Sequence, residues 1–189
     1  VKSFTHIAYI GAVPNVFVVN PSVPARTMAE LIKWIQTQKT PINYGSGGVG
    51  SVGHTVGEMF KAQHKLNMEH VPYKGSSPMH NDLLGGTLQF AVDTYTNNVP
   101  FMKEGKLIGI AVTSRARMAL TPNVPTVGEA GYPKLVAENF LGISAPAGVP
   151  RFEPAPCPDF PVPELARARC GYLVVLENRA VRPDGTVVL

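Results

Sequence analysis

Strand-like and helix-like segments alternate from residue 5 to residue 114, and this alternation limits the fold more than any other feature of the sequence. Continuous apolar runs such as VFVVN at 16–20 are typical of strands that are buried on both faces. Between these runs, apolar residues recur at the spacing of an amphipathic helix. The pattern predicts an α/β fold with a mainly parallel central sheet.

Capping residues and glycines set the bounds of the expected helices. Thr27 with Glu30 three residues later forms a capping box and marks the start of the first helix. Further helices are expected at 51–65, 77–86 and 99–105, and the last two end at glycines. The expected strands are THIAYI (5–10), VFVVN (16–20), INY (42–44), MEHV (68–71), LQFAV (88–92) and KLIGIAVTS (106–114).

A proline-rich stretch at 146–163 interrupts the alternation. It holds seven prolines in eighteen residues, which excludes a helix interior or a central strand, so we place a boundary there. Beyond it, the strand-like runs GYLVVLEN (171–178) and TVVL (186–189) flank the turn RPDG (182–185). These residues predict an irregular tail with a β-hairpin.

Charge and hydropathy exclude two broad classes of function. The net charge is +4, but the basic residues are scattered and no basic run reaches five residues, so nucleic-acid binding is not expected. No apolar run of 18 residues occurs, and no membrane-spanning segment is expected. A mildly basic protein is suited to collecting small anions. The chain starts without a Met or a signal peptide, which we interpret as the loss of an upstream segment.

The glycine-rich stretch NYGSGGVGSVGH (43–54) lies between an expected strand and an expected helix. Its glycines either form a tight turn or let an anion approach the amides of a helix N-terminus, and the stretch alone leaves both interpretations open. Two more loops, 71–77 and 93–98, follow strands, and ligands collect at such loops in α/β sheets. Together the three loops supply neutral donors and two charged groups: Ser46, Ser51, Tyr73, Ser76, Thr94, Lys74 and Asp93.

The same residues are found in other kinds of site, which need further features. The loop lacks the Lys and Ser or Thr of a phosphate-binding loop, and an acidic partner for a dinucleotide is met only loosely, by Glu69. Ser51 and His54 miss the spacing of a hydrolase nucleophile, and the histidines show no metal-binding spacing. His54 is a base, a ligand contact or a packing residue. Lys74 is a site residue or a solvated lysine, and Asp93 a site residue or a helix cap.

Four segments of the chain resemble the Bug-type receptors, the extracytoplasmic solute-binding proteins of tripartite tricarboxylate transporters. The segments are NYGSGGVGSVGHTVGEMFKA, HVPYKGSSPMHNDLLGGTLQFAVDT, GKLIGIAVTSRARMALTPNVPTVGEAGYP and GISAPAGVP, and the resemblance runs from about residue 3 to 150. It implies a lobe of a type II-like periplasmic binding protein, with no enzymatic activity, cofactor or metal. The implied partners are a small carboxylate and the membrane subunits of the transporter, and the intact receptor is expected to be a monomer.

The resemblance also implies a ligand-binding role for one set of residues. These are Ser46, Gly47, Gly48, Gly50, Ser51, His54, Tyr73, Lys74, Asp93 and Thr94. It further implies that 15–138 form the second lobe, that 1–14 and 139–150 are hinge strands and remnants of the first lobe, and that most of the first lobe is missing. Binding is then expected to be impaired, and exposed apolar surface to promote association.

Residues 151–189 do not continue the receptor pattern and form an unrelated tail. They resemble the N-terminal lead of exported α/β-hydrolases, in which a cysteine pair, here Cys157 and Cys170, precedes a strand ending in Glu-Asn-Arg at 177–179. The resemblance implies a disulfide in an oxidising compartment such as the periplasm, and two free thiols otherwise. Two alternatives to the receptor therefore remain: a truncated or fused product without a ligand and, third, a serine hydrolase.

Overall fold

The computed structural model describes the backbone of 4–146, 151–154, 171–174, 180–181 and 187–188, and the side chains of 8–144. The chain forms two compact units. One is Ala12–Phe140; the other combines Val1–Gly11 with Leu141–Leu189. The helices and the candidate site all lie in Ala12–Phe140.

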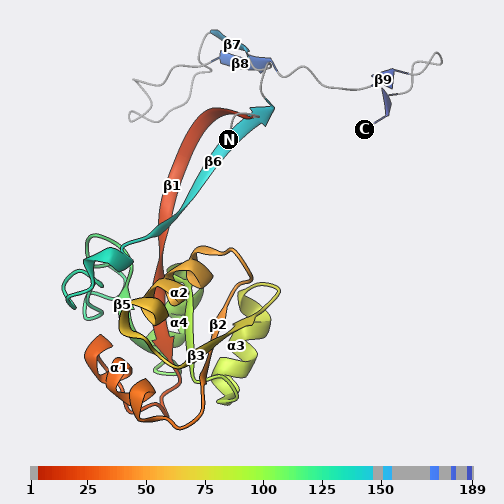
Figure 1. Ribbon diagram of the computed structural model, residues 1–189. Helices are drawn as coiled ribbons and strands as arrows, with labels where there is room; N and C mark the ends of the chain where they lie inside the picture. The colour runs from red at the N-terminus through yellow and green to blue at the C-terminus, as the bar shows by residue number, and fades with distance from the viewer. Residues whose placement is uncertain (1–3, 147–150, 155–170, 175–179, 182–186, 189) are drawn as a thin grey trace. The chain divides into compact units, whose positions relative to one another are not determined.

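A sheet with strand order β3-β2-β4-β1-β5 is the centre of the fold, and β6 pairs with β1 (Figure 1). Its strands are β1 (Phe4–Val19), β2 (Ile42–Ser46), β3 (Met68–Pro72), β4 (Phe90–Thr94), β5 (Ile108–Val112) and β6 (Glu138–Pro146). The α/β class is confirmed, but the sheet is mixed rather than mainly parallel. Strand β2 is parallel to β3 and β4, whereas β1 is antiparallel to β4 and β5.

The antiparallel pairs with β4 and β5 both involve β1, which is one long strand. The two strands predicted at 5–10 and 16–20 are both parts of it, and the intervening Gly11 and Pro14 do not end it. The residues 15–19 then run between β4 and β5 in the opposite direction. The prediction of two separate strands was therefore wrong.

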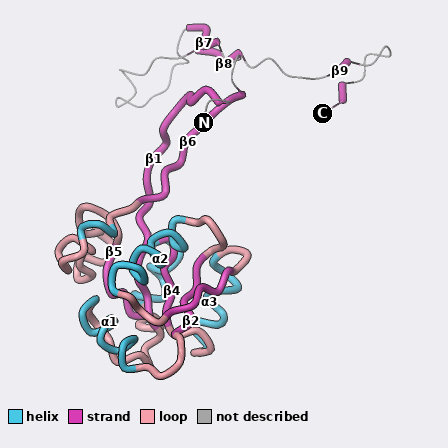
Figure 2. The backbone as a smooth tube through the Cα atoms, viewed as in Figure 1, coloured by secondary structure: helices cyan, strands magenta, loops and turns pink. Residues whose placement is uncertain are grey.

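Helices cover both faces of the sheet, as the tube view shows (Figure 2). They are α1 (Met28–Thr37), α2 (Val52–His64), α3 (Ser76–Gly85), α4 (Tyr95–Lys103) and the 3-10 turn η1 (Pro133–Leu135). The capping box at α1 is confirmed on one side, since Thr27 Oγ1 accepts from the Glu30 amide, while the Glu30 carboxylate accepts from the amide of Arg26. Helix α4 begins four residues earlier than predicted, and Thr94 is its N-cap.

Alternating residues of β1 separate two apolar cores. Phe17 and Val19 pack with α1 and α2, where the rings of Phe17 and Phe60 meet edge to face at 5.3 Å. Val16 and Val18 pack with α3 and α4 on the other face. Because successive side chains of a strand point to opposite faces, one continuous apolar run fills both layers. This three-layer packing fixes the helix starts relative to the strand ends.

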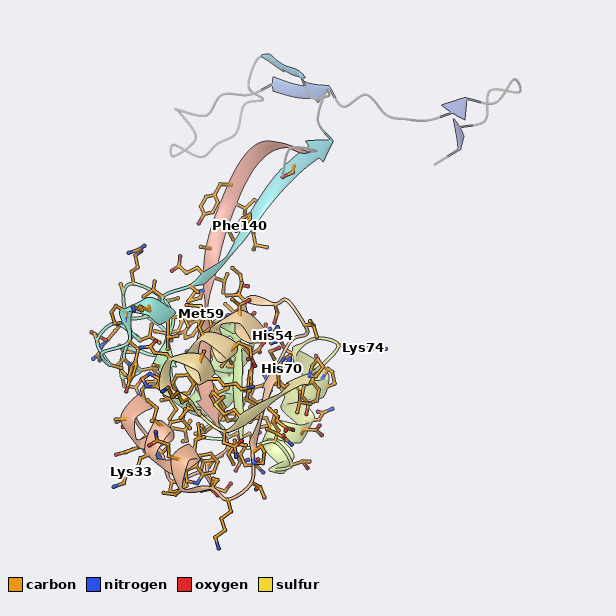
Figure 3. All side chains as sticks on the ribbon, in the orientation of Figure 1. Lys33, His54, Met59, His70, Lys74 and Phe140 are labelled. Atoms are coloured by element: carbon orange, nitrogen blue, oxygen red, sulfur yellow. The ribbon has the colours of Figure 1, made fainter. Side chains whose placement is uncertain are left out.

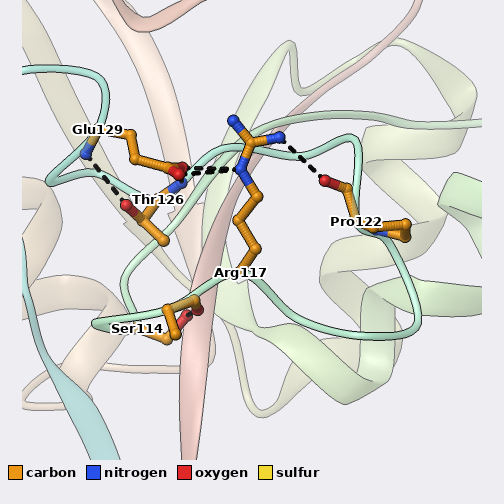
Figure 4. A network of polar contacts seen from close by, with 6 residues as sticks. Ser114, Arg117, Pro122, Thr126 and Glu129 are labelled. Carbon is orange, nitrogen blue, oxygen red and sulfur yellow. Dashed lines mark hydrogen bonds and ion pairs between the residues drawn. The ribbon is translucent and has the colours of Figure 1, made fainter.

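A polar network holds the long connection between β5 and β6 (Figure 4). The Glu129 amide donates to Thr126 Oγ1, and the Thr126 amide donates back to Glu129 Oε2 at 2.8 Å. Arg117 Nε contacts both oxygens of Glu129, and its Nη1 donates to the Pro122 carbonyl. These reciprocal bonds are those of a capping box, here closing a turn.

In the tail, short strands pair in two separate ribbons. Strand β9 (Ala180–Val181) is antiparallel to β10 (Val187–Val188), and these strands lie on either side of the predicted RPDG turn in the sequence. The first predicted hairpin strand pairs elsewhere: β8 (Gly171–Val174) is antiparallel to β7 (Arg151–Pro154). The RPDG turn, Cys157 and Cys170 lie outside the described residues, and their predicted disulfide stays a prediction.

Candidate functional site

Three helices start at the same edge of the sheet, at the carboxyl ends of the parallel strands. Helix α2 follows β2, α3 follows β3 and α4 follows β4, and β2 and β3 end in register at Ser46 and Pro72. A cavity of about 230 Å³ lies where these starts meet. It is lined by Asn15, Gly47, Ser51, Val52, Gly53, Gly75, Ser76, Val92, Asp93, Thr94 and Asn139.

The start of α2 presents free amides to this cavity. Ser51 is the N-cap, and its Oγ accepts from the His54 amide and donates to the Gly48 carbonyl at 2.8 Å. In the part of the chain that the structure describes, the amides of Val52 and Gly53 have no partner. Such amides carry the positive end of the helix dipole and suit an anion.

Glycines shape this start in two ways, and the tight turn predicted from the glycine-rich stretch is one of them. Gly48 and Gly50 have φ values of 140° and 80°, which side chains rarely adopt, and they make the turn. Gly53 allows a close approach, because a Cβ there would overlap the Val92 carbonyl. Helix α2 therefore starts directly against β4.

The starts of α3 and α4 lack side-chain caps. Gly75 is the N-cap of α3 and Thr94 that of α4, and neither supplies a capping hydrogen bond. Among the described residues, the Thr94 hydroxyl has no hydrogen-bond partner. Within the described residues, the first amides of α3 and α4 thus have no side-chain cap, next to those of α2.

Asp93 joins the starts of α3 and α4. Its carboxylate is buried and accepts from Ser76 Oγ at 2.8 Å and from Asn98 Nδ2 at 2.9 Å, and His80 Nε2 lies 3.5 Å away. Burial raises the pKa of the Asp93 carboxyl, but the contacts from His80, Ser76, the Thr94 amide and Asn98 outweigh burial and hold the pKa below its ordinary value. Asp93 is therefore ionised and already paired within the lobe.

His54, the last residue of the glycine-rich stretch, lies next to His70, as the stick view shows (Figure 3). His54 Nδ1 accepts from the Gly50 amide at 3.1 Å, and His70 Nε2 lies 2.7 Å from Ser46 Oγ. Both rings thus hydrogen-bond to the loop, and neither ring lines the cavity. His70 was missed in the sequence, because it belongs to a different strand and no local motif marks it.

Tyr73 and Lys74 lie away from the cavity. The Tyr73 hydroxyl donates to Asp82 Oδ2 at 2.7 Å, and burial together with this contact raises the pKa of Tyr73 to about 12. Lys74 is exposed and points outward from its loop (Figure 3). The exposure and direction of the Lys74 side chain favour its interpretation as a solvated lysine.

Four of the ten predicted site residues line the cavity: Gly47, Ser51, Asp93 and Thr94. The other six, Ser46, Gly48, Gly50, His54, Tyr73 and Lys74, build or flank the loops without lining it. Ser76 was counted among the loop hydroxyls but not among the ligand-binding residues. Asn15 and Asn139 were missed entirely, since they come from strands 124 positions apart.

The lining is neutral apart from Asp93, and it includes no Lys or Arg. Hydroxyls, amides and helix starts are donors that hold an anion without a full opposite charge. In the described ranges, no group of three or more His, Cys, Asp or Glu residues is arranged to hold a metal ion. No helix in the same ranges is long and apolar enough to cross a membrane.

A sequence profile of the tripartite tricarboxylate transporter family receptors (TctC) matches residues 1–152. The chain belongs to this receptor family. Its members are solute-binding receptors and not enzymes. BugT of Bordetella pertussis is 30% identical over 142 residues, which cover 75% of this chain and 44% of BugT. The receptor resemblance stated from the sequence is thereby confirmed.

Solved structures agree with the lobe fold. The Rhodopseudomonas palustris protein Rpa4515, solved with adipate, matches with a TM-score of 0.72 and 33% identity over 78% of this chain and 49% of its own. MatC of the same organism, solved with bound malate, matches with a TM-score of 0.71 and 26% identity over 77% of this chain and 49% of its own. The chain spans about half the length of these relatives.

Proposed function

We propose that Ala12–Phe140 is one lobe of a periplasmic receptor that binds a small organic carboxylate where α2, α3 and α4 start. The observation that supports this most directly is the cavity of about 230 Å³ lined by three helix starts. Two of these starts have no side-chain cap, and the third presents the free amides of Val52 and Gly53. A carboxylate oxygen would satisfy several of these donors together.

Relatives support the ligand class. Rpa4515 was solved with adipate and MatC with malate, and both are small dicarboxylates. The donors of the lining fit such an acid, because they are neutral and the Asp93 carboxylate already accepts from Ser76 and Asn98. Neutral donors can hold an anion without a buried Lys or Arg. The finer identity of the acid depends on residues of both lobes of the intact receptor.

In the intact family the receptor presents its ligand to membrane subunits of the transporter, and we propose the same task for the whole protein. The match covers about half the length of each relative. We therefore expect the lobe alone to leave its ligand open to water on one side. Water weakens hydrogen bonds and charge interactions at such a site. We therefore expect the isolated lobe to bind adipate or malate about a hundredfold more weakly than a two-lobed relative does, a difference of about 3 kcal/mol.

Calorimetry with adipate, malate and citrate tests the proposal, with adipamide as an uncharged control. Adipate or malate is expected to bind and to raise the melting temperature, because a ligand of the folded state stabilises it, whereas adipamide is not. A lobe that folds cooperatively yet binds none of the three acids would contradict the proposal. That outcome would favour a product without a ligand.

A matched pair of threonine variants locates the site. Thr94→Val removes a free hydroxyl from the cavity lining without changing the size of the side chain, and we expect about tenfold weaker binding for the loss of one hydrogen bond. Thr96→Val, on an exposed residue of the same helix, is the control and should bind like the wild type. Equal affinities for the two variants would show that the ligand does not bind at the start of α4.

A further inference from the structure

A series of short polar contacts connects His70, on β3, with Ser51 in the lining of the cavity. His70 Nε2 lies 2.7 Å from Ser46 Oγ, which in turn lies 3.1 Å from the Gly48 carbonyl oxygen. The same carbonyl accepts from Ser51 Oγ at 2.8 Å, and Ser51 lines the cavity. A titratable ring outside the cavity is thus joined to a hydroxyl group inside it.

The state of these contacts depends on the single hydrogen of the Ser46 hydroxyl. Among the described residues it can be donated to His70 Nε2 or to the Gly48 carbonyl. That carbonyl already accepts from the hydroxyl of Ser51 and, at 3.2 Å, from the Ser51 amide. Because a carbonyl oxygen has two lone pairs, Ser46 donates to His70 Nε2 while this nitrogen is unprotonated. The neutral ring of His70 is therefore an acceptor here.

Protonation of His70 reverses this hydrogen bond. The Nε2–H group then donates to Ser46 Oγ, and the Ser46 hydrogen turns to the Gly48 carbonyl. There it competes with the Ser51 hydroxyl, whose hydrogen becomes free for an acceptor in the cavity. A carboxylate oxygen is such an acceptor. The positive charge of the ring also attracts an anion, so both effects strengthen anion binding.

The groups around His70 make it the ring of the stacked pair that takes up a proton. His54 stacks on it from α2, and a proton on His54 Nδ1 would remove the hydrogen bond from the Gly50 amide. The other titratable groups that face His70 come from α2 and β2: Glu58, Lys61 and Tyr44. The first two pair at 3.7 Å, so their charges partly cancel. Burial, and after it the charge of His54, lowers the pKa of His70, which leaves its ring neutral at pH 8.

We infer that binding of a carboxylate in the cavity is coupled to protonation of His70, which acts as a positioning residue through Ser46 and Ser51. The inference rests on the proposed function and adds a regulation by pH to the same site. The bound anion favours the protonated ring, so binding takes up a proton. Linkage is reciprocal, and the proton must therefore increase the affinity for the anion by the same factor.

Calorimetry with malate at pH 8 and pH 6 tests the coupling, because the carboxyls of malate are largely ionised throughout this range. The wild-type chain should bind malate about threefold more tightly at pH 6, since part of the His70 population takes up a proton on binding. Heats measured at pH 6 in two buffers of different ionisation enthalpy should show this proton uptake directly.

A matched pair of histidine variants assigns the effect. His70→Gln keeps a group that can bond to Ser46 but does not titrate, so it should bind malate equally at both pH values and without proton uptake. His64→Gln, in the last turn of α2, is the control and should retain the preference for pH 6 and the proton uptake. A structural role of His70 alone would change the affinity of His70→Gln at both pH values by the same factor and leave the pH dependence intact.

Each outcome decides the inference. A preference for pH 6 that persists in His70→Gln, or equal affinities of the wild type at the two pH values, would overturn it and leave the proposed function standing. A wild-type chain that binds neither malate nor adipate at either pH would overturn both. If His70→Gln does not fold, NMR titration of the His70 ring in the wild type takes its place. Its midpoint should move to higher pH when malate is added, and an unmoved midpoint would equally overturn the inference.

Discussion

The imidazole rings of His54 and His70 stack with their centroids 4.0 Å apart and their planes 25° apart. One ring belongs to α2 and the other to β3, and each contacts the glycine-rich stretch, through the Gly50 amide and the Ser46 hydroxyl. Two stacked imidazole rings are less stable when both are charged, because like charges repel each other. The pair therefore links the shape of the loop to the protonation state of His70.

Acidification is expected to destabilise the lobe through His70. Burial lowers the pKa of His70 first, and the charge of His54 and of Lys61 lowers it further, while Glu58 acts in the opposite sense. A histidine with a depressed pKa binds more protons when unfolded, so its contribution to stability is present above the unfolded value near 6.5 and is lost as pH falls. Melting temperatures should therefore drop between about pH 7 and pH 5.

His70→Gln separates this effect from general acid unfolding. Glutamine keeps a group that can bond to Ser46 but does not titrate, so its melting temperature should depend less on pH in this range than that of the wild type. Parallel curves for the two proteins would contradict the role given to His70.

Gly53→Ala should destabilise the lobe by about 1–3 kcal/mol, the usual effect of overpacking. The reason is the overlap of a new Cβ with the Val92 carbonyl, which is backbone and cannot rotate away. Urea unfolding measures the change. Gly85→Ala in α3 is the matched control, because its Cβ would meet open space and alanine favours a helix. A stable Gly53→Ala protein would show that α2 can shift away from β4.

Asp93→Asn should lower the free energy of unfolding by about 2–3 kcal/mol, since hydrogen bonds to a buried charge are lost. The same depressed pKa of Asp93 means that its stabilising effect is present at neutral pH and lost as pH falls through that pKa. Glu104→Gln breaks an exposed pair with Lys106 and should change stability by less than about 0.5 kcal/mol. Equal losses in urea unfolding would contradict the importance of the buried network.

Exposed apolar side chains on β6 predict self-association. Leu141 and Ile143 are 55% and 49% exposed and, being two residues apart, share one face of the strand. Replacing both with Thr should weaken association at least tenfold in sedimentation experiments, because each buried side chain contributes about 1.5 kcal/mol or more. Leu120→Thr, at an exposed loop leucine, is the control. A dissociation constant unchanged by the double variant would place the contact elsewhere.

The sequence predicted those features that depend on neighbouring residues. The spacing of apolar residues indicated the helices that became α1, α2 and α3, and Thr27 with Glu30 marked a cap that the structure confirms. Loops after parallel strands were expected to carry the site, and Gly47, Ser51, Asp93 and Thr94 from two of them line the cavity. Local spacing determines these elements, because helices and caps form between residues within one or two turns.

Only the tertiary structure decided how distant segments combine. The single strand β1 turned an expected mainly parallel sheet into a mixed one, since the direction of a strand depends on its partners and not on its own residues. The same packing brought Asn139 into contact with Asn15, and His70 into contact with His54. No sequence motif predicts either contact. The sequence by itself determined the α/β class, the helices α1 to α3 and the cap of α1. The fold determined which side chains line the cavity, because burial and hydrogen bonding at that point depend on residues far apart in the chain.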